Sequence, residues 1–320
     1  MLLKSCYCDQ SHLFLYIMVD MKKKSLIIGL IIFLLGGAVV FGLLFKNNYK
    51  RQMSIAQLKK KEPQYTGLIY ASLANGGGMN GEHYLTSIGY DDDKKIIYTT
   101  EQSPEHYVPS MVNVYEVEDP EAMKELDAFV SEYNMSVWDK VPLSDLQVLD
   151  APSTSLNLRF KASEDQKYAD YMTISYERDL SEECFDVLHE FTRKMTSYPM
   201  KKIDQYFEGY KEKKIYIGKD IENSDDDIKE ILCGYFEDEE NKVFVDAYEG
   251  NLRIRGIGSD GYVDYELSDD SIVHEQFKDY DSSWYVKYVN EENTLYVTCS
   301  YEELFIEDMQ GNTYTLKRYL

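Results

Sequence analysis

Hydrophobic and polar positions along the chain follow three successive patterns: one long apolar run, a region that mixes strand and helix periodicities, and a region of strand-like runs only. The apolar run, SLIIGLIIFLLGGAVVFGLLF, covers residues 25–45 and contains no charged residue. At ~1.5 Å rise per residue, a helix of this length crosses a ~30 Å hydrocarbon core. The pattern therefore predicts a transmembrane helix over residues 25–45.

The residues before this helix indicate an uncleaved signal anchor. Lys22, Lys23 and Lys24 lie directly before the apolar run, and neither an A-x-A-like cleavage site nor a lipoprotein cysteine follows it. Residues 1–24 are then expected to form a cytoplasmic tail. Because Met21 begins MKKKSLIIGLI, which has the form of a natural start, we hypothesise that residues 1–20 are a start-site artefact.

Two arguments compete over the orientation of the helix. Six lysines and arginines follow it within residues 46–61, and these alone would place the large domain in the cytoplasm. A compact lysine cluster before a helix so near the N-terminus, however, is the arrangement that exports the chain after it, and long domains translocate largely regardless of charge. We expect a single-pass protein of the cell membrane with the bulk of the chain extracytoplasmic, joined to the helix by a basic stalk over residues 46–64.

Residues 65–200 are expected to form an α+β domain. Asp119 and Pro120 begin one helix that ends at Asn134, and Ser181 opens a second helix that runs to Tyr198. Strands are predicted at Gly67–Ala74, His83–Tyr90, Lys95–Glu101, Met111–Val117, Ser155–Lys161 and Tyr171–Glu177. Segregated strands and helices imply an antiparallel sheet covered on one face.

The remainder of the chain is predicted to form a connector followed by strands alone. Residues 201–229 are expected to form a connector with a charged, helix-like segment at Ile203–Lys213. Residues 230–320 hold short strand-like runs separated by turns, at Val243–Tyr248, Leu252–Ile257, Tyr262–Leu267, Trp284–Val289, Leu295–Ser300, Leu304–Asp308 and Thr313–Arg318. An up-and-down meander of about eight strands closes most readily into a small barrel, which removes its own edges.

The first and last strands of this barrel resemble those of the lipocalin-like small barrels. Gly234-Tyr235-Phe236 stands at the first strand and Lys317-Arg318 on the last. In that family a Gly-x-Trp motif packs under an arginine from the closing strand, so the resemblance implies that Phe236 and Arg318 form a barrel-closing pair. Phe236 replaces the family's tryptophan, and the second motif of the family, Thr-Asp-Tyr, has no counterpart. Family members often hold an apolar ligand, although many small relatives fill their interior with side chains.

Composition and charge restrict the partners. The 29 Tyr and 13 Phe favour a β-rich protein. With 34 Lys and Arg against 57 Asp and Glu, the formal net charge of −23 has the wrong sign for binding nucleic acid. Residues 1–61 contain ten basic and two acidic residues, so the rest of the chain carries about −31. Such a domain attracts cations or basic partners and is itself highly soluble.

Motifs for chemistry are largely missing from the sequence. Gly76, Gly78 and Gly81 match the G-x-G-x-x-G spacing of dinucleotide sites, but a strand is predicted where such a site needs a helix N-terminus, so a hairpin loop is favoured. The acidic runs at 91–93, 225–227 and 237–240 lack the ligand pattern of calcium loops and are interpreted as solvated turns.

No catalytic residue, metal or cofactor is expected. The sequence contains no H-E-x-x-H, G-x-S-x-G or Walker A motif. The cysteines after the apolar run, Cys184, Cys233 and Cys299, are odd in number and are expected to be buried and free.

These features favour a non-catalytic binding or accessory module of the cell envelope with a protein partner. Gly76, Gly77, Gly78, Trp138 and Trp284 are the candidate contact residues, with burial in a core as the alternative for the two tryptophans. Two other functions remain open. The C-terminal barrel would serve as a carrier or sensor of an apolar ligand, or the protein would be an envelope hydrolase that uses paired carboxylates.

Overall fold

The computed structural model describes residues 52–76, 83–103, 108–144, 153–161, 170–209, 211–248 and 250–319. The predicted cytoplasmic tail and transmembrane helix, and the hypothesis about Met21, lie outside these residues. Within the described part of the chain, no helix has both the length and the apolar character needed to cross a bilayer. Residues Ser54–Leu320 form one compact unit.

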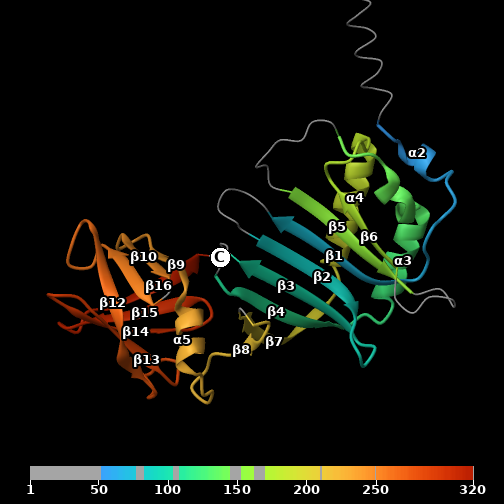
Figure 1. The fold of residues 1–320 in the computed structure, drawn as a ribbon. Helices are drawn as coiled ribbons and strands as arrows, with labels where there is room; N and C mark the ends of the chain where they lie inside the picture. The colour runs from blue at the N-terminus through green and yellow to red at the C-terminus, as the bar shows by residue number, and fades with distance from the viewer. Residues whose placement is uncertain are drawn as a thin grey trace, which may run out of the picture. The chain divides into compact units, whose positions relative to one another are not determined.

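The first part of this unit is an antiparallel sheet of eight strands in the order β6-β5-β1-β2-β3-β4-β7-β8 (Figure 1). Each strand predicted within residues 65–200 is present, with its ends shifted by no more than about two residues, the usual uncertainty of such boundaries. The bounds are β1 Leu68–Gly76, β2 His83–Tyr90, β3 Ile96–Ser103, β4 Ser110–Val117, β5 Ser153–Phe160, β6 Asp170–Ser175, β7 Met200–Glu208 and β8 Lys214–Ile215.

Helices cover one face of this sheet, as predicted. The helices are α3, Ala122–Glu132, and α4, Glu182–Met195. A 3-10 helix, η1, Met135–Lys140, follows α3, and Ser181 is the N-cap of α4. The Asp119 carboxylate accepts a hydrogen bond from the Glu121 N–H at 2.9 Å, so it serves the start of α3 from just outside the helix. The apolar sides of α3 and α4 pack on alternate residues of the strands, which face the helices. These strand residues are all buried: Ala71, Ile88, Leu156, Leu158, Met172 and Ile174.

The prediction of a helix-like connector at Ile203–Lys213 is wrong, because most of this segment lies in strand β7. β7 pairs along its length with β4, which places Phe207 opposite Met111 and buries Phe207 completely. Phe207 is buried while Ile203 is exposed, so the apolar alternation of the strand is weak. Pairing with the otherwise open edge of β4 decides its conformation, and such tertiary context overrides local propensity.

The segment that was predicted as a stalk is docked on the domain from residue 54 onward. A short helix, α2, Ile55–Leu58, buries Leu58 completely. The side-chain amide of Asn134 donates to the carbonyls of Leu58 and Lys61 at 2.9 and 2.8 Å, and the ring of Tyr65 stacks on Phe160 at 5.4 Å between centroids. The sequence of this segment is basic and has no helical period. Its docking was not predicted, because one buried leucine does not make a recognisable pattern.

The C-terminal part of the unit is a closed antiparallel barrel of eight strands, as predicted. Its strand order is β10-β11-β12-β13-β14-β15-β16-β9 (Figure 1). The bounds are β9 Gly234–Asp238, β10 Val243–Tyr248, β11 Asn251–Arg255, β12 Tyr262–Val273, β13 Tyr285–Val289, β14 Thr294–Cys299, β15 Glu303–Asp308 and β16 Thr313–Tyr319.

A helix that the sequence analysis missed, α5, Asp225–Leu232, leads into the barrel. The run at 225–227 was predicted as a solvated turn, but it forms the first turn of α5. Ser224 and Asp227 make a reciprocal capping box, with the Asp227 N–H donating to Ser224 Oγ at 3.2 Å and the Ser224 N–H donating to Asp227 Oδ2 at 3.1 Å. Three acids in the first turn also interact favourably with the helix dipole.

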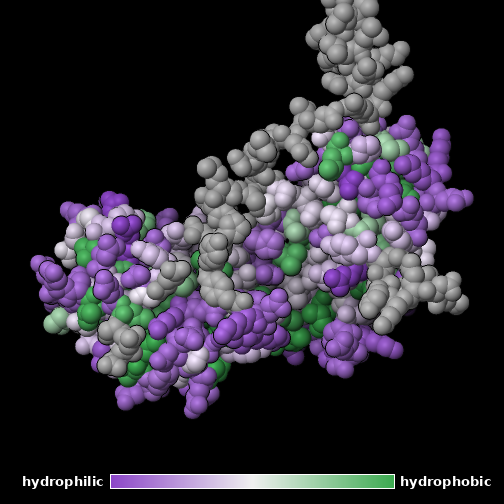
Figure 2. Space-filling view, in the orientation of Figure 1, coloured by the Kyte–Doolittle hydropathy of each residue, from purple (hydrophilic) through white to green (hydrophobic). Residues whose placement is uncertain are grey.

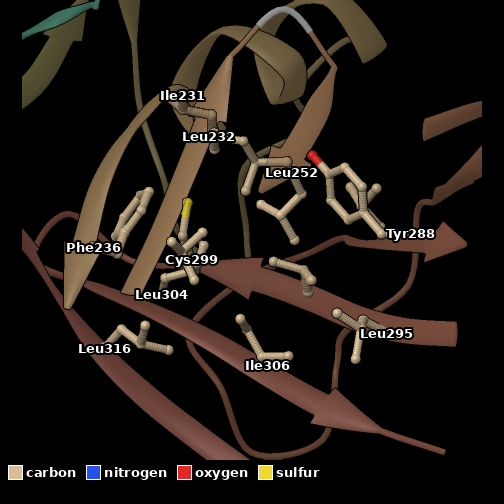
Figure 3. Packing of buried hydrophobic residues seen from close by; sticks show 14 of the residues in the cluster. Ile231, Leu232, Phe236, Leu252, Tyr288, Leu295, Cys299, Leu304, Ile306 and Leu316 are labelled. Carbon is tan, nitrogen blue, oxygen red and sulfur yellow. The ribbon is translucent and has the colours of Figure 1, made fainter. Parts of the chain in front are cut away.

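Side chains from the barrel strands fill its interior. Figure 3 shows the inward-facing residues pointing toward one another from several strands. The buried cluster includes Leu252, Ile254, Trp284, Val286, Tyr288, Leu295, Val297, Leu304, Ile306 and Leu316. A barrel of eight strands has an interior just wide enough for such filling.

Candidate binding face

Two of the five predicted contact residues lie in the core. Trp138 and Trp284 are both fully buried, so the core alternative describes their position. Trp138 donates from Nε1 to the Tyr133 carbonyl at 3.2 Å, and Trp284 belongs to the barrel core. Gly76 ends β1, where it pairs with His83 and Ser153, whereas residues 77 and 78 lie outside the described part.

The predicted pair of Phe236 and Arg318 is present where the barrel closes. The two residues are register partners of β9 and β16, and the guanidinium carbon of Arg318 lies 4.5 Å from the centre of the Phe236 ring. Phe207 of β7 covers the other side of the guanidinium at 4.9 Å. Arg318 also donates to the carbonyls of Cys233 and Ile231 at 2.9 and 2.8 Å, and so it ties the end of α5 to the closing strand.

Gly234 is required by this arrangement. Its φ of +144° is a conformation that side chains rarely allow, and a Cβ atom there would lie 3.1 Å from Arg318 Nη1. Burial lowers the pKa of Arg318, while Cys299 and Cys233 act in the opposite direction. The pair therefore closes the barrel structurally.

The sheet presents a second face, opposite the helices, that we call the open face. Its residues come from alternate positions of six or seven neighbouring strands and lie in three rows across the sheet. The first row is Tyr171, Arg159, Tyr70, Gly89, Ile97 and Glu116. The second row is Thr173, Asn157, Ser72, Ser87, Thr99, Val114 and Asp204, and the third is Ser175, Ser155, Ala74, Leu85, Glu101, Val112 and Tyr206.

Small hydroxyl and amide side chains form the centre of the open face. Thr173 Oγ1 donates to Asn157 Oδ1 at 2.9 Å, and Ser87 Oγ and Thr99 Oγ1 share a hydrogen bond at 2.7 Å. Ser72 and Ser87 are buried, whereas Thr99 and Thr173 in the same row are partly accessible. Figure 2 shows a pale, weakly polar surface over the strands of the sheet, bordered by purple, strongly hydrophilic residues. A hydroxyl both donates and accepts hydrogen bonds, so this surface can adapt to a polar ligand.

One end of the open face carries two cations, one of which lies against tyrosine rings. The guanidinium carbon of Arg159 lies 5.2 Å from the ring centre of Tyr70 and 5.7 Å from that of Tyr171. Tyr70 owes its position to Gly89, because a Cβ atom at Gly89 would come within 2.8 Å of the Tyr70 ring. Lys161, two residues after Arg159, is also exposed.

The other end of the open face is acidic. Lys214 lies 4.4 Å from the centre of the Tyr206 ring and 3.8 Å from Asp204 Oδ2, which also accepts a hydrogen bond from Tyr216 at 3.1 Å. Burial raises the pKa of the Glu208 carboxyl, and the like charges of Glu101 and Glu212 raise it further. The face therefore changes from basic to acidic across the sheet.

The described residues offer no cluster of metal ligands, and their three thiols are buried. No cluster of three or more His, Cys, Asp or Glu side chains suited to a metal occurs among them. Cys184, Cys233 and Cys299 are buried and form no disulfide bond, as predicted. Burial raises the pKa of Cys299 to about 11, against the opposing effect of Arg318, so this thiol is a poor nucleophile.

Sequence reasoning missed the open face, although its signal was present. The strands of residues 65–200 were predicted correctly, and in them small polar residues such as Ser72, Ser87 and Asn157 alternate with the apolar residues that face the helices. Alignment of these positions into rows depends on the strand order, which the sequence did not provide.

Comparison of the chain with protein-family models, with curated protein sequences and with solved structures found no match.

Proposed function

We propose that the protein is a non-catalytic, membrane-anchored module of the cell envelope that binds a macromolecular partner through the open face. The observation that carries this proposal is the open face itself, a polar surface of hydroxyls, amides and tyrosines on the side of the sheet away from the helices. Tyrosine provides large contact area at low entropic cost, and serine and asparagine provide adaptable hydrogen bonds, which is the composition typical of recognition surfaces.

The size of the open face supports a macromolecule over a small metabolite. The second row runs over seven strands, from Thr173 to Asp204, and neighbouring strands lie ~4.8 Å apart, so the row extends over roughly 30 Å. A small ligand would be enclosed in a concave pocket, whereas an extended partner can lie across such a surface.

The anchor is the second part of the proposal. It depends on the uncharged residues 25–45 and on the lysines before them, which favour an exported domain. Because the segment from Ser54 onward is docked on the domain, residues 46–53 would form the link to the helix.

The barrel has a structural role in this proposal. We propose that the barrel is lipocalin-like in the way that Gly234, Phe236 and Arg318 close it. The filled interior disfavours an apolar ligand. Native mass spectrometry of the full chain in detergent tests this point: a clean apo mass supports the structural role, and a retained lipid-sized adduct that survives exchange would support a carrier.

A binding experiment with face-blocking variants tests the proposed function. The full chain in detergent micelles is mixed with purified envelopes of the cells that make it, and the bound fraction is measured by sedimentation. Thr99→Tyr places a bulky ring in the middle of the open face, and Thr315→Tyr places the same ring on the exposed outer side of β16. We expect Thr99→Tyr to weaken binding at least about tenfold and Thr315→Tyr to leave it unchanged. Equal binding by both variants, with both melting like the wild type, would remove the open face from the function.

A further inference from the structure

Arg159 differs from the other arginines of the described barrel and sheet in having no hydrogen-bonding or ionic partner there. Arg253 pairs with Asp264 at 3.1 Å, Arg255 donates to the Asp260 carbonyl at 3.2 Å, and Arg178 donates to backbone carbonyls. The guanidinium of Arg159 instead lies over two tyrosine rings, those of Tyr70 and Tyr171. The side chain of Arg159 is exposed, so its N–H donors are available to a ligand.

The register of the sheet places Arg159 between two tyrosines on the open face. Although the chain contains 57 Asp and Glu, Arg159 forms no ion pair with the described residues. Cross-strand pairing fixes the order Tyr70, Arg159, Tyr171 over β1, β5 and β6, so the sequence places an aromatic ring on both sides of the cation. Stacking on tyrosine limits the motion of the side chain and leaves the edge of the guanidinium free for a planar or tetrahedral anion.

The groups near Arg159 further restrict the chemical class of ligand that the open face can bind. Asn157 and Thr173 follow Arg159 and Tyr171 in the next row, and Lys161 adds a second cation at the same end of the open face. Hydroxyl and amide groups beside tyrosine rings suit the alternating hydroxyls and C–H faces of sugars. The acidic opposite end, with Glu101, Asp204 and Glu208, would repel a polyanion that covered the whole face.

We propose that the open face recognises an acidic glycan: a chain of hydroxylated sugar units with sparse anionic groups, one of which binds at Arg159 between Tyr70 and Tyr171. The anionic group is a carboxylate or a phosphodiester, and both accept the paired N–H donors of a guanidinium. Arg159 gives the site its charge preference, and the hydroxyls of the second row bind the uncharged sugar units. This assignment rests on the proposed function and specifies its partner.

Calorimetric titration of the full chain in detergent micelles with three oligosaccharides of equal length tests the assignment. One oligosaccharide carries carboxylates, one carries phosphodiesters and one is neutral. We expect at least one acidic oligosaccharide to bind about tenfold more tightly than the neutral one, and the preferred one identifies the anionic group. Arg159→Gln should reduce the affinity for that oligosaccharide to the neutral level, and Arg159→Lys should recover only part of it.

Arg253→Gln provides the matched control. Arg253 also lies on an exposed strand near a tyrosine, 5.7 Å from the ring centre of Tyr262, but its charge is paired with Asp264. We expect this variant to bind all three oligosaccharides like the wild type.

The outcomes separate this inference from the proposed function. Equal affinity of Arg159→Gln and wild type for the acidic oligosaccharides would overturn the role of Arg159. If no oligosaccharide binds while Thr99→Tyr still abolishes attachment to envelopes, the partner is a protein: the glycan assignment fails and the proposed function stands. If Thr99→Tyr has no effect on attachment either, both fail.

Discussion

Replacement of Arg318 by alanine should destabilise the barrel strongly. The guanidinium donates to two backbone carbonyls near the end of α5 and lies between the rings of Phe207 and Phe236. Hydrogen bonds from a charged donor contribute about 1.5–3 kcal/mol each, and a desolvated cation–ring contact contributes up to about 2 kcal/mol. Burial of the charge without a carboxylate opposes these gains by several kcal/mol. The lowered pKa of Arg318 reflects that cost. We therefore expect a net loss of roughly 3 kcal/mol.

The assay uses the position of the two tryptophans, one in each part of the fold. Trp284 lies in the barrel core and Trp138 in η1, so Trp138→Phe leaves a fluorescence signal that reports on the barrel. With a urea m-value of ~2 kcal/mol/M, a loss of ~3 kcal/mol moves the unfolding midpoint by about 1.5 M. Lys317→Ala, at the adjacent exposed position, is the control. A midpoint shift for Arg318→Ala as small as that of Lys317→Ala would refute the role of the arginine in closing the barrel.

Three further predictions concern other parts of the fold. Cys299, with a pKa of about 11, should stay unmodified by iodoacetamide at pH 8, where about 0.1% is thiolate, until the protein is unfolded; rapid native labelling would contradict its burial. Asn134→Ala removes two hydrogen bonds to the segment from Ser54 to Lys61 and forces alanine into a φ of +51°, so trypsin should cleave after Lys59 several times faster, and an unchanged rate would show that the segment is not docked by this amide. Glu101→Gln should lower the raised pKa of Glu208 toward its ordinary value, as measured by NMR titration of the Glu208 side chain. The folded-state pKa of Glu208 lies above that of the unfolded chain. The stability that protonation of Glu208 contributes at low pH is therefore lost as pH rises through the folded-state pKa.

Local pattern was sufficient to predict most of the fold. Strands β1 to β6 of the sheet, its two helices, and the strands and closure of the barrel all follow from alternation, capping residues and turns, since local propensity and the overall fold agree in each of them. The pairing of Phe236 with Arg318 was predicted from the resemblance of the first and last strands to those of lipocalin-like barrels.

The remaining features depend on partners that are distant in sequence. β7 carries one strongly buried apolar residue, Phe207, and becomes a strand because β4 is available to pair with it. α5 had a readable signal in Ser224 and Asp227, but the acidic run concealed it. The open face needs the order β6-β5-β1-β2-β3-β4-β7, which brings Tyr171, Arg159 and Tyr70 together from segments far apart in the chain.

Footprinting of exposed tyrosines tests the central claim most directly. Tyr171 on the open face and Tyr262 and Tyr319 on the barrel are 55%, 56% and 56% exposed, so hydroxyl radicals should oxidise them at similar rates in the free full chain. When the chain is bound to envelopes, we expect protection of Tyr171 and unchanged oxidation of Tyr262 and Tyr319. Protection of the barrel tyrosines with Tyr171 still reactive would contradict the assignment of the open face as the binding surface.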